Sequence, residues 1–337
     1  MPPPGSDDAS TGGGRSAVVV GGGQEEQADH RGVSRYPMPT TLRGTIRGVT
    51  TSVTRVRDVE VSALGQTIAR LLVESNYQIP ADVLAALRSA AGREESPLGR
   101  RTIEQLIRNY EVAAAERRPV CQDSGLTVVM LEVGQDAHFV GGSLHDAVYE
   151  AIRVGTRAGF LRWSVTGDPT RRLTIAGGGD TPGVIHVDLV PGDGVRVTVA
   201  SKGFGAENMS ALRMLVPADG VAGIRDVVIE TVDRAGANAC PPIIVGVGVG
   251  GTFETAALLA KKAVLRPLTV RNARPDLCEL EGELLEAVNR LGIGPQGLGG
   301  VVTALAVNVE VYPTHIAGLP VAVNLGCHSM RRATASL

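Results

Sequence analysis

The sequence predicts an α+β fold in which an all-helical lobe comes first and mixed helices and antiparallel sheets follow. From residue 59 to about 115, apolar residues recur at helical spacing. From residue 126 onward, apolar runs, alternating strands and helices follow one another without a regular strand–helix–strand repeat. That mixture favours α+β over a doubly wound α/β fold.

The helical lobe contains three predicted helices. Leu64, Ile68, Leu71 and Leu72 lie on one helical face of the first. The second opens at residues 80–82 and runs through residue 87. In the third, Ser96 is the expected N-cap and Pro97 the first helical residue, and the helix runs to about residue 115.

The second region combines strands, a hairpin and helices. Residues 184–190 and 195–199 alternate on either side of a Pro-Gly-Asp-Gly turn, which predicts an antiparallel hairpin. An apolar run of helical character is expected after residue 208. The remaining strands are predicted at residues 126–133, 243–249, 301–309 and 321–325, and the helices at 144–158, 252–265 and 276–290.

Composition excludes several classes of function. The 337 residues are 43% hydrophobic and 20% charged, with a net charge of −2, so neither nucleic acid nor an anionic membrane surface is an expected partner. No apolar stretch is long enough to span a membrane, and the N-terminus lacks the order of a signal peptide. A cytoplasmic protein is expected, with a disordered tail over residues 1–57 and one domain over 58–337.

The four cysteines form no close pair, which argues against zinc and against disulfides in a cytosolic chain. Cys121, Cys240 and Cys327 each lie in a loop marked by Gly or Pro at a strand edge, whereas Cys278 lies inside a predicted helix. Three thiolates from separate loops can hold three corners of a cubane cluster and leave the fourth iron open. The alternative is that these cysteines are small buried hydrophobic residues.

Other candidate groups have two interpretations each. Asp123, beside Cys121, is either a general acid or base near a metal or the start of an Asx-turn. The glycine-rich segment 202–208 either presents N–H groups to an anion or is a plain loop. His315, in a break between two strands, either handles protons and carboxylates or is structural.

Two segments match the glycine spacing of dinucleotide-binding loops. One comprises Gly246, Gly248 and Gly251, and the other comprises Gly292, Gly294 and Gly297. The first lies between a strand and a helix, but no acidic residue follows about 20 residues later, as a ribose site requires. Close backbone packing is therefore favoured over nucleotide binding, and a nicotinamide-dependent oxidoreductase is kept as a distant alternative.

Six segments between residue 59 and the C-terminus share their order and their residues with one known family. Two single positions differ from the family pattern. Phe204, in the segment 202–208, replaces a small residue, and Ser124, in the segment 120–125, stands where threonine is common. The segments are residues 96–100, 120–125, 202–208, 240–252, 291–300 and 315–327.

On these segments the chain resembles the alpha subunit of the two-subunit, oxygen-sensitive iron–sulfur fumarate hydratases and of the related L-tartrate dehydratases. The resemblance implies the fold of the N-terminal domain of single-chain iron–sulfur fumarases. It also implies that Cys121, Cys240 and Cys327 bind a [4Fe-4S] cluster.

The resemblance assigns further roles. Asp123 is implied as a proton donor or acceptor, and His315 is implied to line the same pocket. Substrate contacts are implied for Gln122, Asp123, Arg162, Gly205 and, more weakly, Asn208. Arg162 matches an arginine that pairs with a substrate carboxylate, for which its fork of donors is suited.

The resemblance also implies a partner. The chain stops ten residues after Cys327, before the second domain that supplies further basic residues and the catalytic base in single-chain relatives. A beta subunit is expected to complete the site. The expected reaction is reversible hydration of fumarate to (S)-malate, with L-tartrate and mesaconate as alternative small dicarboxylate substrates and a non-catalytic cluster-bearing role as a further alternative.

Overall fold

The computed structural model describes residues 56–174 and 181–337. The predicted tail, residues 1–57, therefore lies almost entirely outside the described residues. The chain continues from a short strand, β1 (Arg57–Glu60), directly into the first helix.

The three predicted N-terminal helices are present as α1 (Val61–Tyr77), α2 (Ala81–Arg93) and α3 (Pro97–Glu116). Ser96 caps α3 as predicted, because its Oγ accepts a hydrogen bond from the N–H of Gly99 at 3.1 Å. The helices do not form a lobe of their own. The apolar face of α1 packs on one sheet, whereas α2 and α3 share a core with strands of both sheets.

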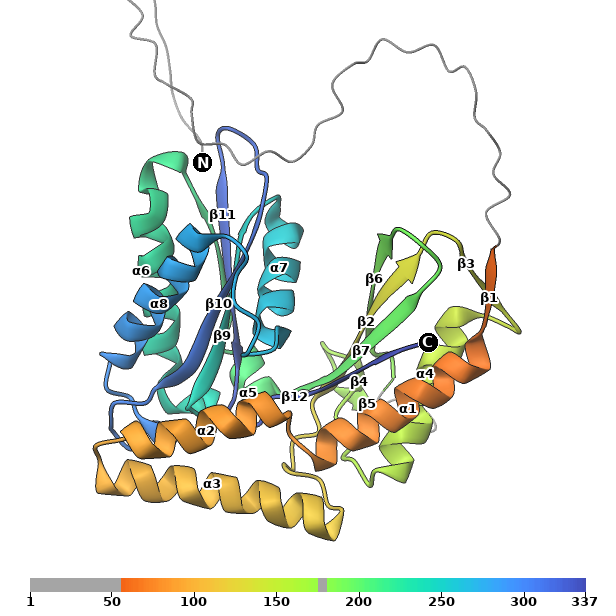
Figure 1. The fold of residues 1–337 in the computed structure, drawn as a ribbon, viewed down its shortest axis with the longest axis horizontal. Coiled ribbons are helices and arrows are strands. Elements are labelled where there is room, and N and C mark those ends of the chain that lie inside the picture. Colours follow the sequence, from red (N-terminus) through yellow and green to blue (C-terminus); the bar gives the residue numbers. More distant parts are fainter. Residues whose placement is uncertain (1–55, 175–180) are drawn as a thin grey trace, which may run out of the picture. The chain divides into compact units, whose positions relative to one another are not determined.

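The first four-stranded sheet has the order β12-β7-β2-β6 and contains parallel and antiparallel pairs. Helices α1 and α4 pack their apolar residues on one face of it, next to the C-terminus (Figure 1). Its elements are β2 (Leu126–Gly134), β6 (Val184–Val190), β7 (Val195–Lys202), β12 (Arg331–Ser336) and α4 (Leu144–Ala158).

The predicted hairpin of residues 184–199 is wrong, although both strands exist. Strand β2 lies between β6 and β7 and pairs with both of them. The turn crosses the end of β2, where the N–H of Gly134 donates to the carbonyl of Gly194 at 2.8 Å and that of Asp136 to Gly192 at 2.9 Å. A buried strand from earlier in the chain thus outcompetes pairing between sequence neighbours.

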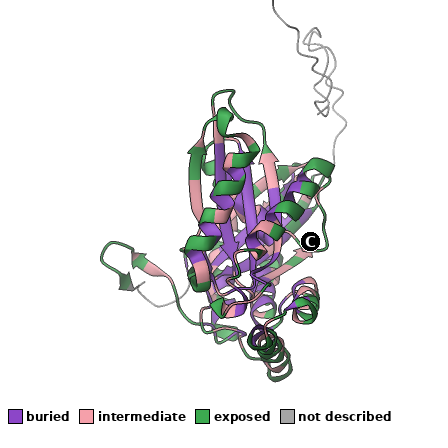
Figure 2. Ribbon diagram, turned by 90° about the vertical axis from the view of Figure 1, so that its left-hand side faces the viewer, coloured by how far each residue is buried: buried purple, intermediate pink, exposed green. Residues whose placement is uncertain are grey.

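The second four-stranded sheet has the order β10-β9-β11-β8. Helices α6 and α8 cover one face and α7 the other (Figure 1). The strands are largely buried and the outer sides of the helices are exposed (Figure 2). The elements are β8 (Ala211–Leu215), β9 (Ile243–Gly250), β10 (Ala304–Tyr312), β11 (Leu319–Gly326), α6 (Gly220–Ala235), α7 (Phe253–Leu265) and α8 (Pro275–Asn289).

Two details of this half differ from the sequence prediction. Residues 211–215 form strand β8, not a helix. Strand β10 begins at Ala304, three residues later than predicted, because the N–H groups of Val301 and Val302 bind the carboxylate of Glu94. The α+β class is confirmed, and each large sheet is mixed rather than purely antiparallel.

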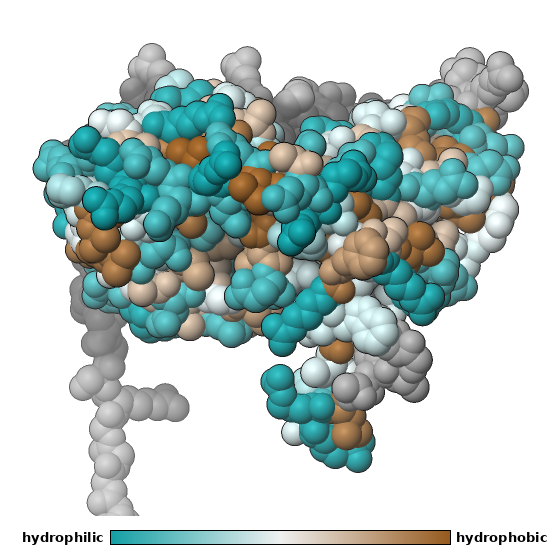
Figure 3. Space-filling view, turned by 90° about the horizontal axis from the view of Figure 1, so that it is seen from below, coloured by the Kyte–Doolittle hydropathy of each residue, from teal (hydrophilic) through white to brown (hydrophobic). Residues whose placement is uncertain are grey.

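The remaining elements are short. The β4–β5 hairpin extends away from the rest of the chain (Figure 2), and the face seen from below mixes hydrophilic with hydrophobic side chains (Figure 3). No helix among the described residues is both long and apolar enough to span a membrane. These elements are β3 (Ala137–Val140), β4 (Thr166–Asp168), β5 (Leu173–Thr174), α5 (Phe204–Glu207) and the 3-10 turns Pro217–Asp219, Gly236–Ala239 and Pro295–Gly297.

Candidate functional site

Cys240 and Cys327 meet because their strands are antiparallel neighbours. Cys240 lies three residues before β9, and Cys327 follows the last residue of β11, where Gly326 pairs with Ile244. The two loops are joined directly, since the N–H of His328 donates to the carbonyl of Cys240 at 3.2 Å. Both thiols are half-buried.

Cys121 reaches the same place from the other sheet. The chain leaves β11, passes Cys327 and enters β12 at Arg331, which pairs with Ser201 of β7. Ser201 in turn pairs with Thr127 at the start of β2, six residues after Cys121. The site therefore lies where the two sheets adjoin.

The pKa shifts of two buried groups indicate that the three thiols lie near one another. Burial raises the pKa of Cys240, and Cys327, Cys121 and Asp123 raise it further. The pKa of Tyr110 on α3 is also raised, first by burial and then by Cys327 and Cys121. Because charge interactions of this kind fall off with distance, Tyr110 lies close to the three cysteines.

Tyr110 has a defined partner. Its hydroxyl forms a hydrogen bond with Nδ1 of His328. Burial and the nearby Arg331 lower the pKa of His328 to about 4, so this histidine is neutral at neutral pH. A neutral ring at this position adds no positive charge beside the thiols.

Asp123 is held by contacts to both carboxylate oxygens. Its Oδ1 accepts from the N–H of Gly125 and its Oδ2 from the N–H of Phe204, each at 2.9 Å. Its main-chain carbonyl accepts from Arg331 Nη1 at 2.5 Å. Gly125 is required here, because its φ is +72° and a Cβ would lie 2.5 Å from the Lys202 carbonyl carbon. The predicted Asx-turn is thus present, and it orients the acid beside the thiols.

The other predicted substrate residues surround Asp123. Gln122 is exposed, and its Oε1 accepts from the thiol of Cys121 at 3.5 Å. The main-chain N–H of Arg162 donates to Ser124 Oγ at 2.8 Å, which leaves the exposed Arg162 side chain next to the Cys121 loop. Gly205 and Asn208 lie in and after α5, whose first N–H binds Asp123.

A charged network anchors the α5 segment. Glu207 forms ion pairs with the buried Lys202 at 2.9 Å and with Lys261 at 2.5 Å, and Asn324 donates to it at 2.8 Å. Burial alone would raise the pKa of Glu207, but the two lysines outweigh it and lower the pKa to about 2. The glycine-rich segment is therefore a fixed support for Asp123.

His315 does not join this cluster within one chain. His315 lies before β11 and Cys327 lies directly after β11. The two residues are therefore separated by the length of the strand, about 23 Å. The imidazole is exposed, and its Nδ1 accepts from the N–H of Ala317 at 3.2 Å. The prediction that His315 lines the same pocket is not met by a single chain.

The first glycine motif serves packing. A Cβ on Gly246 would lie 2.3 Å from the Ala260 carbonyl oxygen, and one on Gly248 would lie 2.1 Å from that of Ala256. Both glycines lie inside β9, not in a loop at the end of a strand, so helix α7 packs directly on the strand. This removes the structural context for the dinucleotide alternative.

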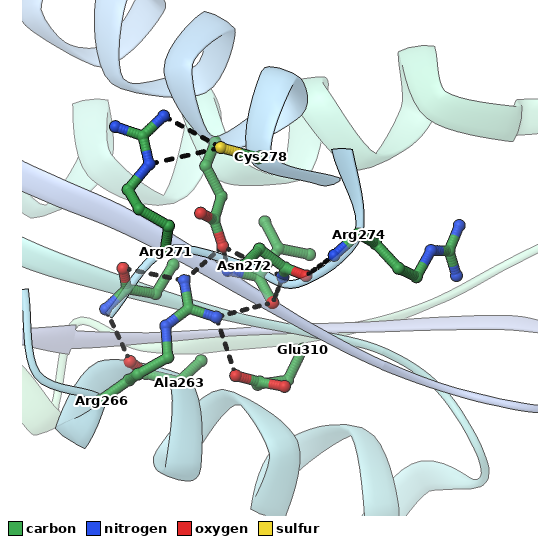
Figure 4. A network of polar contacts seen from close by, with 10 residues as sticks. Ala263, Arg266, Arg271, Asn272, Arg274, Cys278 and Glu310 are labelled. Atoms are coloured by element: carbon green, nitrogen blue, oxygen red, sulfur yellow. Dashed lines mark hydrogen bonds and ion pairs between the residues drawn. The ribbon is translucent and has the colours of Figure 1, made fainter. Parts of the chain in front are cut away.

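Cys278 belongs to a different environment. Its sulfur accepts hydrogen bonds from Arg271 at 2.9 and 3.3 Å, beside a buried network in which Arg266 pairs with Glu281 and Glu310 (Figure 4). Cys278 is not among the groups that shift the pKa values of Tyr110 and Cys240.

The donor set fits an iron–sulfur centre. Three half-buried thiols that form no disulfide lie near one carboxylate, and thiolates are the ligands that such clusters use. Among the described residues, no three His, Cys, Asp or Glu side chains lie close enough together to hold one metal ion.

Sequence reasoning missed Tyr110, His328 and Arg331. Tyr110 and Arg331 are buried beside the site, and His328 is half-buried there. Arg331 carried a weak signal, because it belongs to a pair of arginines directly before the small residues 333–336.

The fumarate hydratase (Fumerase) family model matches residues 65–336. The chain belongs to this family. It is a hydro-lyase of the fumarate hydratase and tartrate dehydratase type.

Several relatives of this hydro-lyase are named as tartrate enzymes. A Methanocaldococcus jannaschii protein provisionally named L(+)-tartrate dehydratase subunit alpha is 37% identical over 273 residues, which are 80% of this chain and 96% of the relative. The Escherichia coli L(+)-tartrate dehydratase subunit alpha is 33% identical over 275 residues, which are 81% and 90% of the two chains. The Shigella sonnei subunit of the same name is 32% identical over the same length.

Proposed function

We propose that this chain is the alpha subunit of a [4Fe-4S]-dependent hydro-lyase that removes water from a hydroxy-dicarboxylate, and that a beta subunit completes its active site. The convergence of three unpaired thiols on one fixed carboxylate carries the proposal. Cys121, Cys240 and Cys327 would hold the cluster. When bound, it supplies an iron without a protein ligand, which acts as a Lewis acid toward the substrate hydroxyl.

The residues of this chain would hold the substrate and move a proton. The exposed Arg162 guanidinium would bind one carboxylate through its fork of donors. Gln122, Gly205 and Asn208 would contact the rest of the diacid. Asp123, whose oxygens are fixed by two N–H groups, would transfer a proton to or from the departing or attacking water.

A partner chain is needed on two grounds. A diacid has two carboxylates, whereas the buried cations beside the site, Lys202 and Arg331, are already engaged with groups of this chain. Large apolar side chains flank the site uncovered, with Phe160 85%, Trp163 56% and Phe204 45% exposed. Exposed apolar groups of this size mark contact surfaces. A role for His315 at such a site would likewise require that it come from a second chain.

L(+)-tartrate is proposed as the first substrate to test. The sequence prediction ranked fumarate first, but the relatives named above are tartrate dehydratase subunits. Fumarate and (S)-malate remain the second candidate, because the matching family model is described as fumarate hydratase. No observation favours mesaconate.

The test is anaerobic co-purification with the beta subunit, followed by assays with L(+)-tartrate, (S)-malate and fumarate. The tartrate proposal expects loss of L(+)-tartrate at a higher kcat/KM than hydration of fumarate. Asp123→Asn should retain iron and lose activity by about 100-fold or more, while the exposed Asp226→Asn should change neither. An iron-loaded complex inactive on all three diacids would contradict the proposed reaction.

A further inference from the structure

Arg331 is a buried cation whose partners are both neutral. It is 1% exposed at the first position of β12. Its Nη1 donates to the main-chain carbonyl of Asp123 at 2.5 Å and to Asn76 Oδ1 at 3.2 Å. Its Nε is buried and has no partner among the described residues.

Other buried arginines are paired with carboxylates. Arg332, the next residue, binds Asp82 at 2.5 Å, and Arg266 binds Glu281 and Glu310 (Figure 4). Removing a charge from water is unfavourable unless an opposite charge compensates it. By this comparison Arg331 forms no ion pair with a carboxylate among the described residues.

The position of Arg331 indicates where that counter-charge belongs. Arg331 lies four residues after Cys327, and its guanidinium binds the main-chain carbonyl of Asp123, two residues after Cys121. Asp123 is also near, since a Cβ on Gly203 would lie 3.1 Å from Asp123 Oδ2 and 3.2 Å from Arg331 Nη2. That carboxylate is bound by the N–H groups of Gly125 and Phe204 and forms no ion pair with Arg331 among the described residues.

We propose that Arg331 is the counter-cation of the thiolate-bound cluster, which it stabilises and whose reduction potential it raises. The inference rests on the proposed function, because three thiolates around a cluster core leave net negative charge at this place. Net charge near a cluster is one of the properties that set its potential. Through its contact with the Asp123 carbonyl, Arg331 is also a positioning residue that fixes the acid relative to the cluster.

The test separates the charge of the Arg331 side chain from its hydrogen-bonding geometry, in the anaerobic complex of both subunits. Arg331→Gln removes the charge, Arg331→Lys keeps it without the fork, and Asn76→Ala keeps it while removing a partner. Arg332→Gln is the control, since it breaks a buried ion pair on the same strand. The readouts are iron content, the rate of cluster loss to a chelator and the midpoint potential from electron paramagnetic resonance.

Arg331→Gln should show a more negative potential and about tenfold faster cluster loss. Arg331→Lys and Asn76→Ala should keep a reduction potential near that of the wild type. Arg332→Gln should lower the stability of the fold without shifting the reduction potential. An unchanged potential in Arg331→Gln would overturn the proposal. If that variant does not fold, an Arg331→Lys potential shifted negative would do the same. Wild-type complex without iron would instead contradict the proposed function.

Discussion

At the scale of single residues, the site depends on buried charges that the rest of the chain compensates. Glu207 shows this most clearly, because two lysines and Asn324 converge on its carboxylate. The network supports the segment whose N–H group binds Asp123. Its stability is therefore expected to depend on pH.

Glu207→Gln should lower the unfolding free energy by on the order of 2 kcal/mol at pH 7. The pKa of Glu207 is about 2 in the folded chain and near 4.5 ordinarily. The unfolded state thus binds more protons between these values, and the stabilisation, complete above about pH 5, is lost as the pH falls toward 2. Urea unfolding of both proteins at pH 7 and pH 3 measures this.

The exposed Glu286, which pairs only weakly with Arg290, supplies the control. Glu286→Gln should leave stability nearly unchanged at both pH values. A Glu207→Gln deficit as large at pH 3 as at pH 7 would show that lost packing, not charge, causes the effect.

At the scale of elements, the position of α7 depends on the absence of side chains from one face of β9. Gly246 and Gly248 let the helix backbone approach the strand. Strand β9 begins directly after the loop that carries Cys240 and ends at Gly250. Displacing α7 would therefore disturb the sheet that positions two of the three thiols.

Gly248→Ala should destabilise the protein by about 2–3 kcal/mol, because the new Cβ would overlap the α7 backbone. Gly282→Ala is the matched substitution, since a Cβ there meets nothing within 4 Å and the residue lies inside helix α8. It should stabilise by about 0.5–1 kcal/mol. Thermal unfolding of both variants checks the pair, and equal effects would argue against tight packing at β9.

Local patterns predicted the helices well and strand pairing poorly. Helical spacing and the Ser96–Pro97 cap are local, so the boundaries of α3 followed from the sequence. The pairing of β6 and β7 with β2 depends on a segment some 50 residues earlier, which the turn signal cannot reveal. The sequence did not predict strand β12, because Arg331 and Arg332 stand at its start and the strand shows no clear alternation of apolar and polar residues. The grouping of the three thiols came from family resemblance, since their spacing alone left a core role open.

At the scale of the whole molecule, the site joins three loops from two sheets. Replacing any one of Cys121, Cys240 or Cys327 with serine should abolish iron retention in the anaerobic complex. Cys278→Ser should retain it, because Cys278 lies in α8 against Arg271. Iron and sulfide analysis measures this, and iron loss in Cys278→Ser alone would place the cluster elsewhere.

The turn that crosses the end of β2 has a consequence for protein engineering. Surface turns usually accept inserted peptides, but this turn accepts hydrogen bonds from Gly134, the last residue of β2, and from Asp136 just beyond it. The other end of that strand leads into Asp123, roughly 30 Å away along the chain. An insertion that lets β2 slide by one position would reverse the facing of its side chains. A tag placed in this turn should therefore impair the acid at the opposite end of the sheet while leaving the turn itself fully accessible.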